Sequence, residues 1–150
     1  MQAHTWILVA DGARARIFET NPQDTEHFTE IRDFSNPAAK SHASDLETDK
    51  LDRFYGGKGQ AGPGHSAEAR EDPFEHAARV FTHDVGAFLD RACAEHRYEK
   101  LYVVAPSKFI GAIRKSMDKR TQASVNKEII KDISGLSEPE IENYVKSALH

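Results

Sequence analysis

The chain has 150 residues and a formal net charge of -4, a length that suits one domain with a core of its own. This small negative charge excludes a strong overall attraction to nucleic acid or to an anionic membrane. The single cysteine, Cys93, excludes an intramolecular disulfide and a multi-cysteine zinc site, and its apolar helical surroundings favour packing in the core. No apolar run approaches the roughly 20 residues of a membrane span, and no export signal is visible, so we expect a cytoplasmic protein.

The first 34 residues predict three antiparallel strands. Residues 5–10 (TWILVA) are an apolar run of strand length, and residues 13–20 (ARARIFET) are a second strand pattern. Asp11 and Gly12 between them predict a hairpin turn, because both residue types tolerate positive φ. A turn at 21–24 leads to a third strand over 26–34.

Residues 35–72 are poor in apolar side chains and rich in turn formers, which predicts a long mobile loop. A glycine-rich stretch within it, GGKGQAGPGHSAEAR over 56–70, is either a connector, a loop that meets a partner, or a phosphate cradle. The phosphate-loop pattern fails, because a glycine and not a hydroxyl residue follows the lysine and no strand precedes it. The binding candidates here are Gly56, Gly57, Lys58, Gln60, Gly64 and His65.

The second half of the chain predicts alternating helices and strands. A helix over 74–96 begins behind Asp72 as N-cap and Pro73, and the apolar run 101–105 (LYVVA) predicts a central strand covered on both faces. A basic amphipathic helix over 108–120 follows, and then a strand over 125–133 and a terminal helix that starts near 137–140. The inward side chains predicted for the basic helix are Phe109, Ile110, Ile113 and Met117.

The order β-β-β-α-β-α-β-α predicts a single α/β domain over 1–150 with a mixed five-stranded sheet and flanking helices. It is the element order of a ribonuclease-H-like layout. Element order predicts a fold and leaves the function open.

Three segments resemble the bacterial host attachment proteins, a family described as required for attachment to host cells. They are WILVADGARARIFE over 6–19, LYVVAPSKFIGAIRK over 101–115, and KEIIKDIS followed by EPEIE within 127–142. The chain is also similar to the middle domain of archaeal and eukaryotic peptide-chain release factors. The resemblance implies that fold, and it implies a role in host attachment or in contact with the ribosome.

That release-factor domain has a Gly-Gly-Gln loop that enters the peptidyl-transferase centre, and this chain departs from the motif. His65 stands where the glutamine belongs in one register, and Lys58 and Gly59 separate the glycine pair from Gln60 in the other. We therefore expect no peptide-release activity. A ribosome-rescue factor or peptidyl-tRNA hydrolase that uses Gln60 or His65 stays as an alternative.

One segment is locally basic. Residues 108–132 contain 7 Lys/Arg and 3 Asp/Glu, whereas residues 1–107 contain 12 and 18. Either this segment is a solvated salt-bridging face, or it binds an anionic partner such as RNA. Its candidate binding residues are Lys108, Arg114, Lys115, Lys119, Arg120, Lys127 and Lys131.

A metal-dependent nuclease is the remaining alternative. Asp11 ends the first predicted strand, and its possible carboxylate companions are Glu71, Asp72 and Asp132. The three aspartates also have ordinary explanations: Asp11 as a turn residue, Asp72 as a helix cap, and Asp132 as a polar residue at the end of a strand. His76 and His83 lie seven residues apart on one helix, about 10 Å of rise, which is too far for one metal ion.

We therefore expect a non-enzymatic cytoplasmic binding protein that contacts RNA, the ribosome or a protein partner through the glycine-rich loop and the basic segment. The sequence implies no cofactor, no bound metal, no membrane span and no DNA specificity, and it has no signal for a particular oligomeric state.

Overall fold

The computed structural model describes residues 4–21, 24–39 and 72–149. Its strands are β1 (Thr5–Ala10), β2 (Arg14–Asn21), β3 (Asp24–Ser35), β4 (Lys100–Ala105) and β5 (Val125–Ile130). Its helices are α3 (Pro73–Ala94), α4 (Ser107–Ser116), α5 (Lys119–Ser124) and α6 (Glu138–Leu149). The predicted order of elements is confirmed, with one short helix, α5, added. Most of the loop predicted over 35–72 lies outside the described residues.

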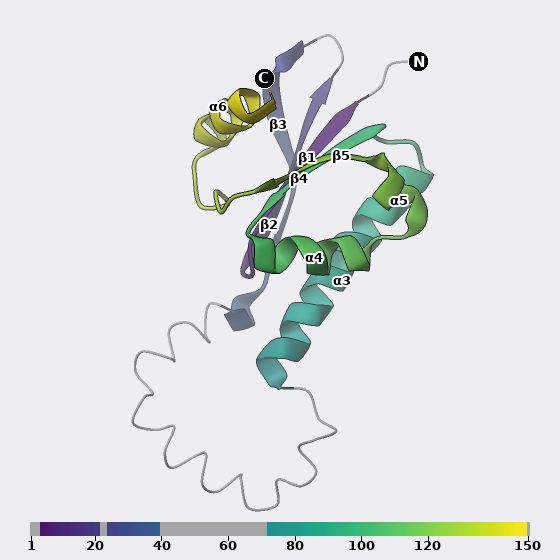
Figure 1. Ribbon diagram of the computed structural model, residues 1–150, viewed down its shortest axis with the longest axis vertical. Helices are drawn as coiled ribbons and strands as arrows, with labels where there is room; N and C mark the ends of the chain where they lie inside the picture. Colours follow the sequence, from purple (N-terminus) through teal and green to yellow (C-terminus); the bar gives the residue numbers. More distant parts are fainter. Residues whose placement is uncertain (1–3, 22–23, 40–71, 150) are drawn as a thin grey trace, which may run out of the picture.

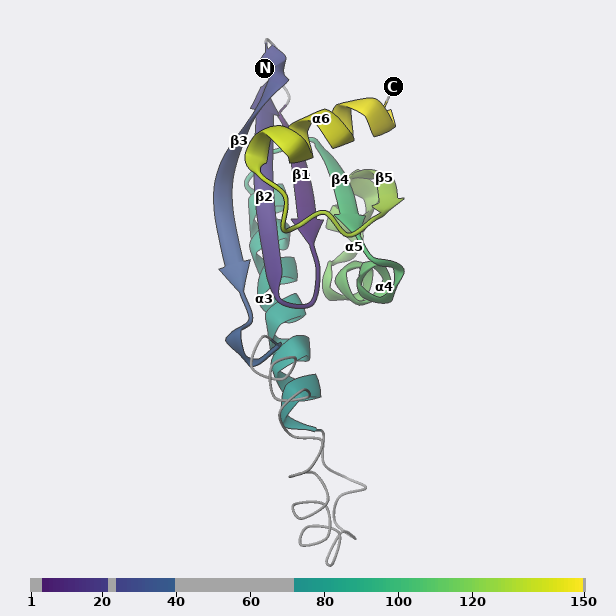
Figure 2. The same cartoon turned by 90° about the vertical axis from the view of Figure 1, so that its left-hand side faces the viewer.

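The five strands form one mixed sheet in the order β3-β2-β1-β4-β5 (Figure 1). β1, β2 and β3 pair antiparallel, whereas β4 pairs parallel with both β1 and β5. Figures 1 and 2 show α3, α4 and α5 on one face and α6 on the other. Both views also show the N-terminal end of α3 extending past the sheet. The predicted α/β fold class is confirmed.

The sheet has a hydrophobic core on each face. Trp6 and Leu8 of β1 pack against α3 and α4, whereas Ile7 and Val9 point to the opposite face and pack under α6. This alternation follows from the two-residue repeat of a strand. It gives β1 and β4 a buried side chain at nearly every position, and it confirms the prediction that 101–105 is a strand covered on both faces.

The β1–β2 hairpin forms where it was predicted, but its turn differs from the expected one. No glycine in the described residues has positive φ, so Gly12 does not supply the left-handed conformation expected of it. The Asp11 side chain holds the turn instead: its Oδ1 accepts from the N–H groups of Ala13 and Arg14 at 2.7 and 2.9 Å. An aspartate that bonds its own backbone in this way makes positive φ unnecessary.

The predicted helix over 108–120 is wrong at its end. α4 stops at Ser116, because Met117 is extended and Asp118 caps a new helix, α5. The Asp118 carboxylate accepts from the Thr121 N–H at 2.8 Å, and this bond lowers the pKa of Asp118. Gln122 donates to the carbonyls of Arg114 and Met117, which satisfies acceptors at the break. An N-cap aspartate in mid-segment therefore divides one expected helix into two.

The strand predicted over 125–133 is also shorter than expected. β5 ends at Ile130, where its parallel partner β4 ends at Ala105. Ile133 is nevertheless buried, since the chain turns there under α6. The apolar alternation predicted a longer strand, but its last member, Ile133, is buried in the segment after the strand and not in β5 itself. By contrast, α3 begins as predicted, with Asp72 accepting from the Phe74 N–H at 2.7 Å.

Candidate functional site

Part of the predicted site lies outside the described residues. This part comprises the glycine-rich candidates Gly56, Gly57, Lys58, Gln60, Gly64 and His65, together with Glu71. The candidates that the structure describes are three aspartates (Asp11, Asp72 and Asp132), two histidines of α3 (His76 and His83), and the seven cations between residues 108 and 131.

Asp11 has a structural role in this fold. One carboxylate oxygen accepts two backbone N–H bonds within the turn, and the other accepts from the Ser134 hydroxyl at 2.6 Å. Ser134 lies 123 residues further along the chain, in the turn before α6. Asp11 therefore ties the β1–β2 turn to the segment that leads into α6, and both of its oxygens are engaged.

The proposed companions of Asp11 do not form a metal site with it. Asp72 caps α3, and Asp132 is exposed beyond the end of β5. Within the described residues, no group of three or more His, Cys, Asp and Glu side chains is arranged to hold a metal ion. The nuclease alternative consequently gains no support from the part of the chain that the structure describes.

The cations predicted as one basic face point to different places. Arg114 makes a two-pronged ion pair with Glu128, with Nε donating at 3.0 Å. That pair raises the pKa of Arg114. Lys127 donates to the Ala148 carbonyl of α6 at 3.0 Å. Lys108 and Lys115 lie along α4 beside α3, and the other three side chains, Lys119, Arg120 and Lys131, are exposed.

Lys108 and Lys115 border a groove of about 490 Å³ between α3 and α4. The opposite wall comes from α3, where Arg79 and His83 are one helical turn apart. The floor is small or apolar, and it consists of Ala78, Thr82, Phe109, Ala112 and Ser116. Among the described lining residues there is no carboxylate. The groove thus presents basic or imidazole groups on two sides of a largely apolar floor.

A close contact at one end of the groove sets the approach of the two helices. Gly86 of α3 lies directly against Ser116 of α4, and a Cβ built on Gly86 would lie 2.3 Å from the Ser116 carbonyl oxygen. Only glycine permits this approach. Arg79 is not among the binding residues that the sequence predicts. The four-residue spacing to His83 was visible, but which face of α3 would meet α4 was not.

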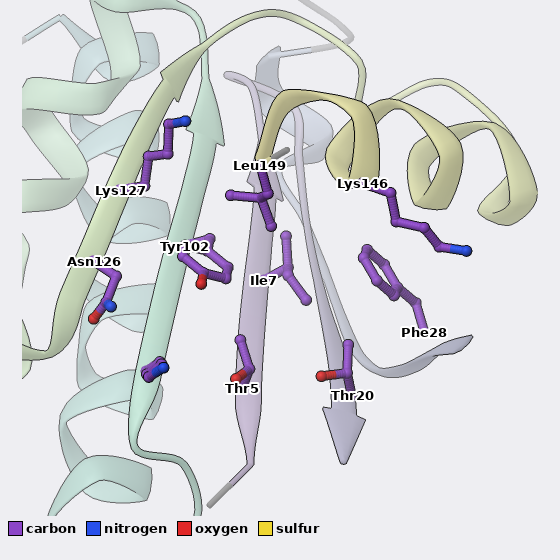
Figure 3. Close-up of a pocket in the computed structure, with 10 residues that line it drawn as sticks. Thr5, Ile7, Thr20, Phe28, Tyr102, Asn126, Lys127, Lys146 and Leu149 are labelled. Carbon is purple, nitrogen blue, oxygen red and sulfur yellow. The ribbon is translucent and has the colours of Figure 1, made fainter. Parts of the chain in front are cut away.

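A second cleft, of about 470 Å³, lies between α6 and the opposite face of the sheet (Figure 3). Its lining combines three lysines, two threonines, an asparagine and four large side chains, namely Thr5, Ile7, Thr20, Phe28, Lys100, Tyr102, Asn126, Lys127, Lys146 and Leu149. Only Lys127 of this set was among the predicted binding residues, because the others come from six separate elements.

The sheet order and the two helix layers define a single-domain α/β protein with a ribonuclease-H-like order of strands. Residues 6–145 match the family model described as "Protein required for attachment to host cells". The chain belongs to this family. None of the curated proteins matches it. Within the described residues, no helix combines the length and the apolar character needed to cross a bilayer.

Two solved structures are similar to this chain. One is an archaeal translation termination factor, with 8% sequence identity, a TM-score of 0.44, and coverage of 97% of this chain and 39% of that chain. The other is described as an archaeal protein, with 11% identity, a TM-score of 0.46, and coverage of 97% and 38%. The chain therefore spans about two fifths of the length of each.

Proposed function

We propose that this protein is a non-enzymatic, cytoplasmic RNA-binding protein, and that it contacts ribosomal or other RNA through the groove between α3 and α4. The single observation that supports this most directly is the pairing of Arg79 and His83 on one wall with Lys108 and Lys115 on the other. The family description names a phenotype and no molecular activity. We propose RNA binding as the molecular activity.

The charges of the groove suit a phosphate backbone. Lys108 and Lys115 are exposed, and within the described residues neither ammonium has an ion-pair or hydrogen-bond partner. Their donors are therefore available to a ligand, unlike those of Arg114, which Glu128 already occupies. Cations on both walls can neutralise phosphates on either side of a strand, and this contact drives affinity in a salt-dependent way.

The floor of the groove suits a base. Phe109 is half-buried, and its ring packs edge-on against Phe81 with 6.4 Å between ring centroids. An aromatic ring between cations is the combination that binds unpaired bases, because stacking needs no particular base sequence. We therefore expect a preference for single-stranded RNA over a duplex.

The non-catalytic part of the proposal rests on Asp11. Both of its carboxylate oxygens accept hydrogen bonds that hold the β1–β2 turn and the segment before α6. Of the other possible metal ligands in the described residues, Asp72 caps α3 and Asp132 is exposed. We expect a labelled RNA to stay intact when it is incubated with the protein and Mg²⁺. Cleavage that disappears in Asp11→Asn would instead favour the nuclease.

RNA binding is tested by fluorescence anisotropy with a labelled single-stranded RNA at salt concentrations from about 50 to 200 mM. The Lys108→Gln/Lys115→Gln double variant should weaken binding and reduce the slope of log affinity against log salt by about 1 to 2, since two phosphate contacts are lost. The matched control is Lys119→Gln/Lys131→Gln, which removes two exposed lysines outside the groove.

Equal effects of the two double variants would contradict the groove as the binding site. Binding that is absent, or that does not respond to salt, would contradict RNA as the partner. Co-sedimentation of the protein with ribosomes, lost in the groove variant only, would identify ribosomal RNA as the target.

A further inference from the structure

We propose that the cleft between α6 and the sheet is a separate binding site for a small phosphate ester that has a flat ring, of about the size of a mononucleotide. The proposal does not depend on RNA binding, because the cleft lies on the other face of the sheet from α3 and α4. It rests on three features of the cleft: its register-matched polar end, its aromatic floor and its lysines.

The pairing of the strands brings the polar groups to one end of the sheet. Thr5 pairs with Thr20 of the antiparallel β2 and with Lys100 of the parallel β4, so the three side chains lie on one face in adjacent strands. Asn126 lies at the start of β5, beyond β4. This end of the sheet therefore provides two hydroxyls, an amide and an ammonium within one cleft.

The hydroxyl of Thr20 makes no hydrogen bond with the described residues of the fold. The residue is only 7% exposed, yet within the described residues its side chain has no hydrogen-bond partner. In Figure 3 its oxygen points into the cleft, on the side of Thr5 and Ile7. The oxygen itself is reachable from the cleft, since it is not among the buried unpaired polar atoms of the described residues, so a ligand can bond it in place of water.

The middle of the cleft is apolar and aromatic. Ile7 and Phe28 are buried, and Tyr102 is half-buried. Figure 3 shows the Tyr102 and Phe28 rings on either side of Ile7, with Leu149 of α6 above them. A flat ring can be enclosed here, and the volume of about 470 Å³ falls within the range of small-molecule sites.

The lysines favour an anion. Lys127 donates one bond to the Ala148 carbonyl, which offsets the negative end of α6 and leaves two N–H groups for a ligand. Lys146 is 3.7 Å from Glu142 and is therefore partly neutralised. Lys100 has no ion-pair or hydrogen-bond partner among the described residues. The lining thus keeps a net positive charge beside hydroxyl and amide donors, which is the chemistry that recognises phosphate.

The proposal is tested by two-dimensional NMR titration of the protein with adenosine 5′-monophosphate. We expect saturable shifts of the Thr5, Thr20 and Tyr102 amide signals. Inorganic phosphate and adenosine should each bind at least about tenfold more weakly, because each probe lacks one half of the recognised structure.

Two variants assign the shifts to the cleft. Lys100→Gln and Thr20→Val should each weaken the binding of adenosine 5′-monophosphate at least about fivefold, since each removes a donor to phosphate. Lys108→Gln, in the groove between α3 and α4, is the matched control and should leave it unchanged. An unchanged amide spectrum of each free variant shows that the fold is intact.

The absence of shifts at about 10 mM adenosine 5′-monophosphate would overturn the proposal, because that concentration detects even millimolar affinity. Equal affinity in Lys100→Gln and in the unaltered protein would also overturn it. Failure of this site leaves RNA binding untouched, because the RNA test uses variants of the other face.

Discussion

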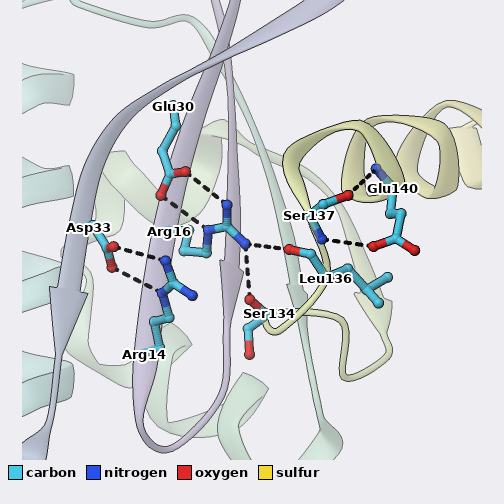
Figure 4. Close-up of polar contacts among 8 residues, drawn as sticks. All are labelled: Arg14, Arg16, Glu30, Asp33, Ser134, Leu136, Ser137 and Glu140. Carbon is cyan, nitrogen blue, oxygen red and sulfur yellow. Dashed lines mark hydrogen bonds and ion pairs between the residues drawn. The ribbon is translucent and has the colours of Figure 1, made fainter.

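Among single residues, Arg16 is a charged side chain that the fold buries. It is 6% exposed, and its guanidinium makes a two-pronged pair with Glu30 at 2.9 and 3.1 Å (Figure 4). The remaining nitrogen donates to the carbonyls of Ser134 and Leu136 at 3.1 and 2.7 Å. Arg16 thus joins β2, β3 and the turn before α6.

Replacement of Arg16 by Met should strongly destabilise the fold. The change leaves the Glu30 carboxylate and two carbonyls without their donor, which should cost about 2 to 4 kcal/mol. The measurement is the free energy of unfolding from urea denaturation.

Arg14→Met is the matched control for this prediction. Arg14 makes the same kind of pair with Asp33, and that pair raises the pKa of Arg14, but the two side chains are 39% and 46% exposed. Solvent screening should limit the loss to about 0 to 1 kcal/mol. Equal losses in the two variants would show that Arg16 is not anchored as the structure describes.

The sequence does not distinguish these two arginines. They stand two residues apart on one strand, so both point to the same face. The difference arises because the turn before α6 covers Arg16 and leaves Arg14 in solvent. The sequence around Asp11 likewise fits both a turn residue and a catalytic candidate, and the fold is what brings the Ser134 hydroxyl to its carboxylate.

At the scale of elements, the packing of α3 against α4 depends on Gly86. Because a Cβ there would lie 2.3 Å from the Ser116 carbonyl oxygen, Gly86→Ala must push the helices apart. We expect a loss of about 1 to 3 kcal/mol from overpacking, and weaker RNA binding by the widened groove.

Gly111→Ala in α4 is the matched control. Nothing lies within 4 Å of a Cβ at that position, so the substitution should stabilise the helix by about 0.5 to 1 kcal/mol. Thermal and urea unfolding of the two variants provide the comparison. A neutral Gly86→Ala would contradict the close helix contact.

The ends of elements were predictable where local chemistry determines them. Ser137 and Glu140 form a reciprocal cap at the start of α6, where the sequence predicts a helix to begin, with the Ser137 N–H donating to Glu140 at 2.9 Å (Figure 4). This bond lowers the pKa of Glu140. The break between α4 and α5 was missed, because the apolar spacing continues through Met117 while Asp118 ends the helix.

At the scale of the whole molecule, the two cores share one sheet and should unfold together. Trp6 is the only tryptophan and reports on the core under α3, whereas Ile141 is buried in the core under α6. Ile141→Ala should cost about 2 to 5 kcal/mol by leaving a cavity. Because the sheet couples the faces, the Trp6 fluorescence midpoint in urea should fall with it.

The test of this coupling is the comparison of two signals. Trp6 fluorescence and far-ultraviolet circular dichroism should give the same midpoint in Ile141→Ala. A fluorescence midpoint that stays at its original value while the circular dichroism midpoint falls would show that α6 and its core unfold independently.

Local sequence patterns were enough to predict the order of elements, the buried character of β1 and β4, and the family. Strand alternation, helical spacing and capping residues are local patterns, and each forms from a few neighbouring side chains. The sequence also identified a basic segment, but it treated the seven cations between residues 108 and 131 as one surface.

The positions of those cations depend on how the helices and strands pack. Arg114 is paired with Glu128, and Lys127 donates to the Ala148 carbonyl at the end of α6. Lys108 and Lys115 instead line a groove whose other wall is α3. The cleft under α6 is likewise assembled from residues at both ends of the chain. Such sites depend on strand register and on helix packing across long sequence separations, which no local pattern encodes.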